Sequence, residues 1–202
     1  MSDVLVLYYS RYGATEALAR EVCQGVDSVA GMSSRLRTVA PVSAVTEAAE
    51  SSVPDSGPPY ATTQDLIDCA GLVMGSPTRF GNMGAALKYF LDGTGSDWIK
   101  GTLSGKPAGV FTSTSSLHGG NESTLLTMAI PLLHHGMLFV GLPYTEQDLA
   151  TTTTGGSPYG ATHVTWNRDV DELSAEEKRL ARALGKRVAD VAQRLAGDTG
   201  HN

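Results

Sequence analysis

The chain has 202 residues, of which 41% are hydrophobic and 18% charged, and its formal net charge is −6. This composition is ordinary for a globular protein and excludes a disordered or fibrous chain, while the length predicts one domain over residues 1–202. No run of lysine and arginine could follow a phosphate backbone, so we expect no nucleic-acid binding.

The first element is the apolar run Val-Leu-Val-Leu-Tyr-Tyr at residues 4–9, which predicts a strand covered on both faces. Asp3 rather than a basic residue precedes the run, which is too short for a signal-peptide core or a membrane span, so we expect a cytoplasmic protein without a membrane segment. From Thr15 onward, apolar residues recur at three- and four-residue steps and predict a helix. Cys23 and Cys69 lie in helical patterns and are interpreted as small buried thiols without a redox role.

The next segment predicts a more polar second strand at residues 34–39. It is followed by an inserted, irregular stretch over about residues 41–62, rich in Pro, Ser, Thr and Ala. A short helix at residues 64–70 and a buried third strand at residues 71–75 come next.

The second half continues the alternation of helices and strands. A helix is predicted at residues 83–91, a fourth strand at 106–112, a helix at 125–135 and a fifth strand at 137–140. A second inserted stretch, rich in Gly and Thr, covers about residues 143–167.

The last helix is marked by a capping box, because Ser174 precedes Glu177 by three residues. Leu180, Leu184 and Val188 then share one helical face. Five strands that alternate with helices predict an α/β protein with a parallel sheet and helices on both faces.

The loops after the first, third and fourth strands are candidate sites, because ligands of such sheets bind at the carboxyl ends of the strands. Residues 10–15 place two hydroxyls, a glycine and backbone N–H groups at a helix start, where they can hold a phosphate. They match neither the P-loop nor the G-x-G-x-x-G pattern. The alternative interpretation is a Ser/Thr helix cap with a turn glycine.

The other two loops also indicate a ligand. Residues 76–83, Ser-Pro-Thr-Arg-Phe-Gly-Asn-Met, join an aromatic ring and a cation to a glycine, which suits a planar heterocycle, although Asn82 could equally cap the next helix. Residues 113–120 hold four consecutive hydroxyl residues and end in two glycines, a composition that is costly to order unless a ligand occupies it.

These loops, together with His-His-Gly-Met at residues 134–137 and Ser-Pro-Tyr-Gly-Ala-Thr at residues 157–162, resemble the tryptophan-repressor-binding-protein (WrbA) family of type IV NAD(P)H:quinone oxidoreductases. The match runs in order from about Val4 to Thr162, and the last helix also fits. The resemblance implies a flavodoxin-like three-layer sandwich with sheet order 2-1-3-4-5. It further implies FMN as the cofactor, NADH or NADPH as the electron donor, a quinone as the substrate, and a homotetramer.

The resemblance also assigns roles to residues. The first loop would cradle the FMN phosphate, the second would line the isoalloxazine ring, the third would close over it, and a histidine after the fourth strand would reach the flavin. The residues so assigned are Ser10, Arg11, Tyr12, Gly13, Ala14, Thr15, Pro77, Thr78, Arg79, Phe80, Gly81, Asn82, Ser113, Thr114, Ser115, Ser116, Leu117, His118, Gly119 and His134. Tyr12 and Trp98 would form the pocket for nicotinamide and quinone, with Trp98 supplied across a subunit contact. No catalytic side chain is expected, because the flavin carries the chemistry.

Other interpretations stay open at this point. His134 and His135 could be a surface pair at a helix end, and Trp98 could simply pack. A metal site is not expected, because adjacent histidines point in different directions. The chain could also be a flavodoxin-type electron carrier, or a flavin-binding regulatory or interaction protein.

Overall fold

The computed structural model describes residues 2–42, 54, 56–166, 169 and 171–197. Within this part of the chain, one parallel sheet has the order β2-β1-β3-β4-β5, and β6 also pairs with β4. The strands are β1 (Ser2–Tyr8), β2 (Met32–Thr38), β3 (Gly71–Pro77), β4 (Pro107–Thr114), β5 (Leu138–Phe139) and β6 (Ala161–Val164). The helices are α1 (Ala14–Asp27), α2 (Thr63–Asp68), α3 (Ala85–Asp92), α4 (Gly95–Ile99), α5 (Asn121–His134), α6 (Asp148–Thr151) and α7 (Ala175–Gly197). The predicted sheet order and flavodoxin-like α/β fold are confirmed.

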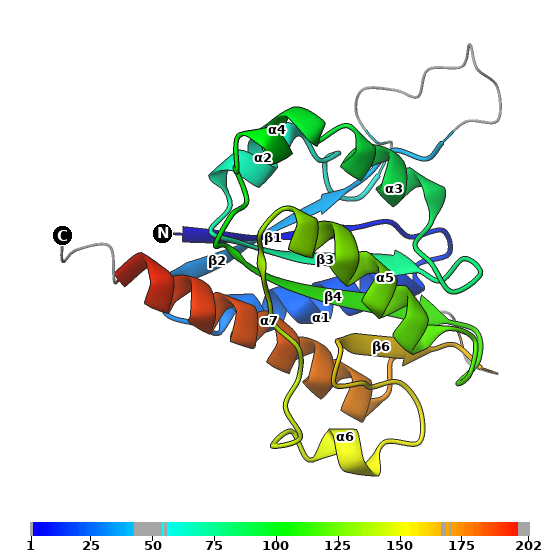
Figure 1. Cartoon of the computed structure of the whole chain (residues 1–202). Coiled ribbons are helices and arrows are strands. Elements are labelled where there is room, and N and C mark those ends of the chain that lie inside the picture. The colour runs from blue at the N-terminus through cyan, green and yellow to red at the C-terminus, as the bar shows by residue number, and fades with distance from the viewer. Residues whose placement is uncertain (1, 43–53, 55, 167–168, 170, 198–202) are drawn as a thin grey trace.

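The sheet lies between two helical layers, with α1 and α7 on one face and α2, α3 and α5 on the other (Figure 1). Strand β1 shows why its sequence is apolar throughout. Val4 and Val6 belong to the core under α1 and α7, whereas Leu5 and Leu7 belong to the core on the opposite face. Because successive strand residues point to opposite faces, a centrally placed strand must be apolar at every position.

Helices α1 and α7 pack unusually closely, and two glycines permit the approach. A Cβ atom at Gly25 would lie 1.9 Å from the carbonyl oxygen of Arg182, and one at Gly185 would lie 2.0 Å from that of Val22. Any side chain at either position would therefore push the two backbones apart.

The fifth position of the sheet is shared by two short strands. β5 pairs with Pro107 and Ala108 at the start of β4, whereas β6 pairs with residues 111–114 at its end. The inserted stretch at residues 143–167, which the sequence indicates as irregular, thus contains both α6 and a strand. The four residues of β6 follow Gly160 and are too few to show a periodic pattern.

Smaller differences from the prediction concern the connections. Trp98 lies in the short helix α4, an element that the sequence patterns do not predict. Most of the first insertion, residues 43–53 and 55, lies outside the described residues. No helix in the described ranges is long and apolar enough to cross a bilayer.

Candidate functional site

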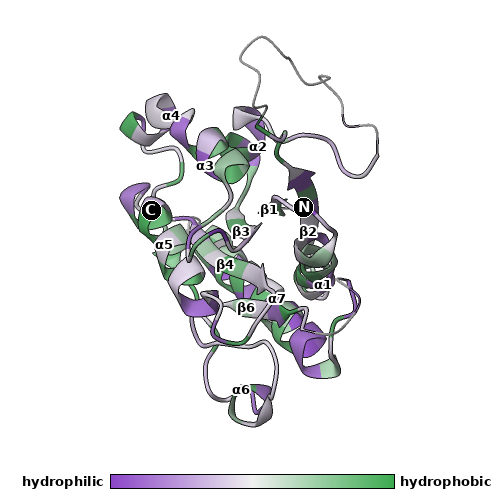
Figure 2. Ribbon diagram, turned by 90° about the vertical axis from the view of Figure 1, so that its right-hand side faces the viewer, coloured by the Kyte–Doolittle hydropathy of each residue, from purple (hydrophilic) through white to green (hydrophobic). Residues whose placement is uncertain are grey.

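The site is built at the carboxyl ends of β1, β3 and β4, onto which Figure 2 looks. β1 has β2 on one side and β3 on the other, so the chain changes direction across the sheet at this point. Loops that leave neighbouring strands at such a switch point splay apart and leave a crevice between them. The three predicted loops are those that border this crevice.

The first loop leads into α1 through Gly13, whose φ of 97° lies in the left-handed region. Its N–H donates to Ser10 Oγ at 3.1 Å, and no side chain caps the start of α1. The helix-cap interpretation is therefore not supported. Thr15 is buried, and its Oγ1 lies 2.8 Å from Ser113 Oγ of β4. Helix N–H groups without a capping partner beside two hydroxyls form a site suited to a phosphate.

The second and third loops are joined to each other by hydrogen bonds. The Thr78 N–H donates to the Ser113 carbonyl at 2.9 Å, and Thr124 Oγ1 donates to Thr78 Oγ1 at 2.8 Å. Gly120, with a φ of 100°, lies against the second loop, and a Cβ atom there would be 3.0 Å from the Gly81 Cα. These contacts hold the two loops against each other.

A cavity of about 190 Å³ lies where the loops meet. No aspartate or glutamate lines it in the described part of the chain, and a cavity of this size and composition fits the phosphate end of FMN. Its lining residues are Ser10, Arg11, Tyr12, Ala14, Thr15, Pro77, Thr78, Arg79, Ser113, Thr114, Ser115 and Thr165. Thr165 is a site residue that the sequence does not indicate. It follows the unpredicted strand β6, and its N–H donates to the Thr114 carbonyl at 2.9 Å.

Other predicted site residues lie around this cavity rather than in it. Phe80 is fully exposed at the tip of the second loop with a φ of 54°, and Asn82 Oδ1 accepts from the Met83 N–H at 2.8 Å. Asn82 does not cap α3, whose N-cap is Gly84. The rest of the third loop lines a separate cavity of about 410 Å³, which is bordered by Ser116, Leu117, His118 and Trp166. Within this loop, the Gly119 N–H donates to the Ser116 carbonyl.

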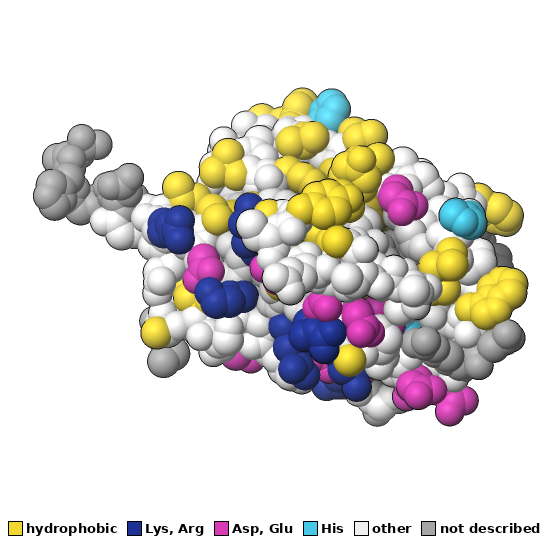
Figure 3. All heavy atoms as spheres, turned by 90° about the horizontal axis from the view of Figure 1, so that it is seen from below, with side chains coloured by type: hydrophobic (Ala, Val, Ile, Leu, Met, Phe, Trp, Pro, Cys, Tyr) yellow, Lys and Arg dark blue, Asp and Glu magenta, His cyan; other side chains and the backbone are white. Residues whose placement is uncertain are grey.

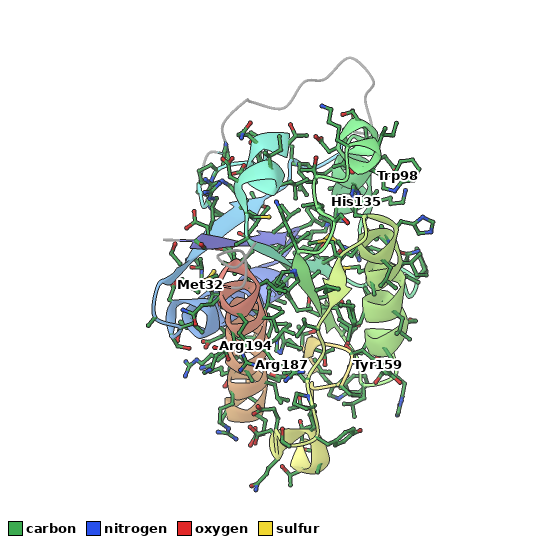
Figure 4. All side chains as sticks on the ribbon, turned by 60° about the vertical axis from the view of Figure 1, so that its left-hand side comes forward. Met32, Trp98, His135, Tyr159, Arg187 and Arg194 are labelled. Carbon is green, nitrogen blue, oxygen red and sulfur yellow. The ribbon has the colours of Figure 1, made fainter. Side chains whose placement is uncertain are left out.

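His134 and Trp98 lie far from the three loops within one chain. Trp98 Nε1 donates to the His134 carbonyl at 2.7 Å, and Thr94 Oγ1 lies 3.1 Å from His135 Nε2, which ties α4 to the last turn of α5. Figure 4 shows Trp98 and His135 at this end of the molecule. The third loop leads into the opposite end of α5, and a helix of 14 residues is about 21 Å long.

A buried carboxylate fixes the strand next to the site. Glu177 is 0% exposed, and burial raises its pKa, but the hydrogen bonds that it accepts outweigh burial and lower the pKa to about 2. Because His163 of β6 is paired with Ser113 of β4, the carboxylate holds in place the strand that flanks the cavity where the three loops meet. Its donors are His163 Nδ1 at 2.9 Å, Thr154 Oγ1 at 2.7 Å, and the N–H groups of Gly155, Val164 and Ser174 at 2.9, 3.1 and 2.8 Å.

Comparison with known proteins agrees with this architecture. The profile of the family described as NADPH-dependent FMN reductase matches residues 3–146. Relatives from Solidesulfovibrio magneticus and Cupriavidus metallidurans, both named NAD(P)H dehydrogenase (quinone), are each 44% identical; the alignments cover 96% and 98% of this chain and 98% and 100% of theirs. A solved flavodoxin, a WrbA-like protein from Agrobacterium tumefaciens, has the same fold, with a TM-score of 0.70 at 24% identity over 96% of this chain and 99% of that one. These findings confirm the resemblance drawn from the loop motifs, and the chain belongs to the NADPH-dependent FMN reductase family.

Proposed function

We propose that the chain is an FMN-dependent NAD(P)H dehydrogenase (quinone) that reduces quinones by two electrons. The observation that carries the proposal is the uncapped start of α1 beside the hydroxyls of Thr15 and Ser113, at the switch point of the sheet. The names of the relatives from S. magneticus and C. metallidurans support the same activity. When bound, FMN supplies the redox chemistry by accepting a hydride from the nicotinamide and passing two electrons to the quinone.

The protein's own part is to bind and orient. The α1 N–H groups, with Ser10, Thr15 and Ser113, hold the phosphate, while the second loop borders the ring. Tyr12 and Phe80 are exposed aromatic side chains at the rim, and such rings offer flat surfaces for the nicotinamide and the quinone. One pocket then serves both substrates in turn.

Replacing Thr15 by valine keeps the size of this side chain and removes its hydroxyl. We expect the dissociation constant of FMN to rise at least about tenfold, because a hydrogen bond to a charged group contributes about 1.5–3 kcal/mol. Fluorescence titration of the apoprotein measures this constant. Thr151→Val, which removes an exposed hydroxyl of α6, is the matched control and should leave it unchanged. Unchanged FMN affinity in Thr15→Val would remove the phosphate role of Thr15.

Sharing one pocket also predicts the kinetic mechanism. Initial rates with NADH and benzoquinone should give parallel lines in double-reciprocal plots, because the oxidised dinucleotide leaves before the quinone binds. Each substrate should also inhibit competitively against the other at high concentration. Intersecting lines, which require both substrates to be bound together, would contradict the shared pocket.

We further infer that the protein forms a homotetramer, the assembly that the resemblance to the WrbA family implies. Helix α5 offers a surface for a subunit contact, because it is apolar on its outer face as well as its inner one. Leu125, Met128 and Leu132 are buried against the sheet, whereas on the outer face large apolar side chains remain exposed. These exposed side chains are Leu126, Ile130 and Leu133, with Leu138 and Tyr159. Figure 3 shows hydrophobic side chains gathered on the side of the molecule that carries α5. A helix that is apolar all round is normally buried.

Assembly would also account for the predicted roles of His134 and Trp98, which could reach only the loops of another subunit. Light scattering of the purified protein should return the mass of four chains. A monomer mass would overturn this inference.

A further inference from the structure

A second cavity, of about 530 Å³, adjoins the proposed FMN site. It lies between the first loop, the second loop and the start of α3, and it has Arg11 and Arg79 in common with the smaller cavity. A ligand in the larger cavity can therefore extend along the protein surface to the edge of the smaller cavity, in which we place the FMN phosphate.

The charges around this cavity have one sign. Arg11, Arg79 and Lys88 line it, and none of the lining residues in the described part of the chain is an aspartate or a glutamate. Lys88 is paired with Asp92 of its own helix. Arg11 and Arg79 have no carboxylate within ion-pair distance among the described residues, and the Arg11 guanidinium lies 5.4 Å from the Tyr12 ring centroid.

The two arginines differ in this respect from most arginines of the fold. Ion pairs to carboxylates are made by Arg20, Arg35, Arg37, Arg179 and Arg182. Since the whole chain carries a net charge of −6, two unpaired guanidiniums beside one cavity form a local positive site in an acidic protein. Guanidinium groups match phosphate geometry by donating two parallel hydrogen bonds, so a phosphate ester is the ligand chemistry that this site favours.

We propose that this cavity binds the phosphate-bearing adenosine half of the nicotinamide dinucleotide, and that Arg11 and Arg79 favour NADPH over NADH. The proposal rests on the proposed function, because it requires that the donor reach the neighbouring flavin. NADPH carries a 2′-phosphate that NADH lacks, and this group adds negative charge at the end of the molecule farthest from the nicotinamide. Tyr9, Met83 and Ala86 give the cavity an apolar wall against which ribose and adenine can pack.

The test uses the FMN-loaded protein and 2′,5′-ADP, a fragment of NADPH that has both phosphate positions and no nicotinamide. Isothermal titration calorimetry should show 2′,5′-ADP binding at least about tenfold more tightly than 5′-AMP, and kcat/KM should be higher for NADPH than for NADH. In Arg11→Gln, affinity for 2′,5′-ADP should fall about tenfold, as one charge-assisted contact is lost. Lys88→Gln, at the other side of the cavity, should weaken it less, because Asp92 already pairs with this lysine.

Arg194→Gln is the matched control, since this exposed arginine lies near the end of α7 and lines neither cavity (Figure 4). It should leave the affinity for 2′,5′-ADP unchanged. Absorbance of the bound flavin, measured in every variant, separates loss of FMN from loss of the fragment.

Two results would overturn the proposal: failure of the wild-type protein to bind 2′,5′-ADP, and unchanged affinity for 2′,5′-ADP in Arg11→Gln. If Arg11→Gln also lost FMN while its affinity for the fragment stayed unchanged, this arginine would belong to the flavin site alone. Failure of the proposed function looks different. In that case neither NADH nor NADPH reduces the bound flavin, whatever the calorimetry shows for the fragment.

Discussion

Replacing Glu177 by alanine is expected to lower the free energy of unfolding by about 3–5 kcal/mol, because each buried donor left without an acceptor costs about 1–3 kcal/mol. The carboxylate is fully buried and accepts five hydrogen bonds. Its loss leaves the N–H groups of Gly155 and Val164 and the ring of His163 without an acceptor. His163 Nε2 already has no hydrogen-bond partner in the structure, so Nδ1 is the only ring nitrogen that now has one.

Urea denaturation measures this loss, and the neighbouring Glu176 provides the control. Glu176 is partly exposed and forms a 3.5 Å ion pair with Arg179, so Glu176→Ala should change the free energy of unfolding by less than about 1 kcal/mol. Equal stabilities of Glu176→Ala and Glu177→Ala would show that the buried hydrogen bonds contribute little.

The same carboxylate predicts a dependence of stability on pH. The pKa of Glu177 is about 2 in the folded protein, against an ordinary value of 4.5. The stabilisation of the folded protein by ionised Glu177 is therefore fully present above about pH 4.5 and is lost as the pH falls toward 2. This lowering of the pKa corresponds to about 3 kcal/mol in the free energy of unfolding. Glu177→Gln should lose less stability than the wild type over this window. Identical pH profiles would contradict a depressed pKa.

Replacing Gly185 by alanine is expected to destabilise the protein by about 2–3 kcal/mol, although glycine-to-alanine changes inside helices usually stabilise by about 1 kcal/mol. The reason is the Cβ position, 2.0 Å from the Val22 carbonyl oxygen and 2.9 Å from its carbon. Backbone atoms cannot rotate away as a side chain can, so α1 and α7 must separate and lose packing.

Gly197 at the end of the same helix is the matched control, because nothing lies within 4 Å of a Cβ atom there. Gly197→Ala should be neutral or slightly stabilising in urea denaturation. A Gly185→Ala protein as stable as the wild type would mean that the two helices do not need this close approach.

The fold could be predicted from local patterns because its central strands are buried on both faces and its last helix begins with a capping box. The apolar run at residues 4–9 predicts β1. Ser174 and Glu177 predict the start of α7, where the Glu177 N–H donates to Ser174 Oγ at 3.1 Å. The four-residue strand β6 could not be predicted, since it depends on contacts with distant parts of the chain. It pairs with residues 111–114, which lie 50 positions earlier (161 − 111), and Glu177 accepts hydrogen bonds from its His163 and Val164.

The parts of the candidate site that come directly after a predicted strand could be predicted, and these are its three loops. Thr165 lines the same cavity but follows β6, so it could not be predicted without that strand. The capping box revealed two of the bonds around Glu177, but the donors from residues 154–155 and 163–164 come from the second insertion. Similarly, the sequence does not show that α5 carries His134 away from the loops.

Binding of FMN at this rim of the sheet, and its reduction there by a nicotinamide cofactor, can be followed in one experiment. The FMN-loaded protein is titrated anaerobically with NADPH or NADH. We expect one FMN per chain, complete loss of the oxidised flavin absorbance after one equivalent of donor, and its full return after one equivalent of benzoquinone. A protein that takes up no FMN, or whose bound flavin stays oxidised with excess donor, would not be the proposed FMN-dependent dehydrogenase.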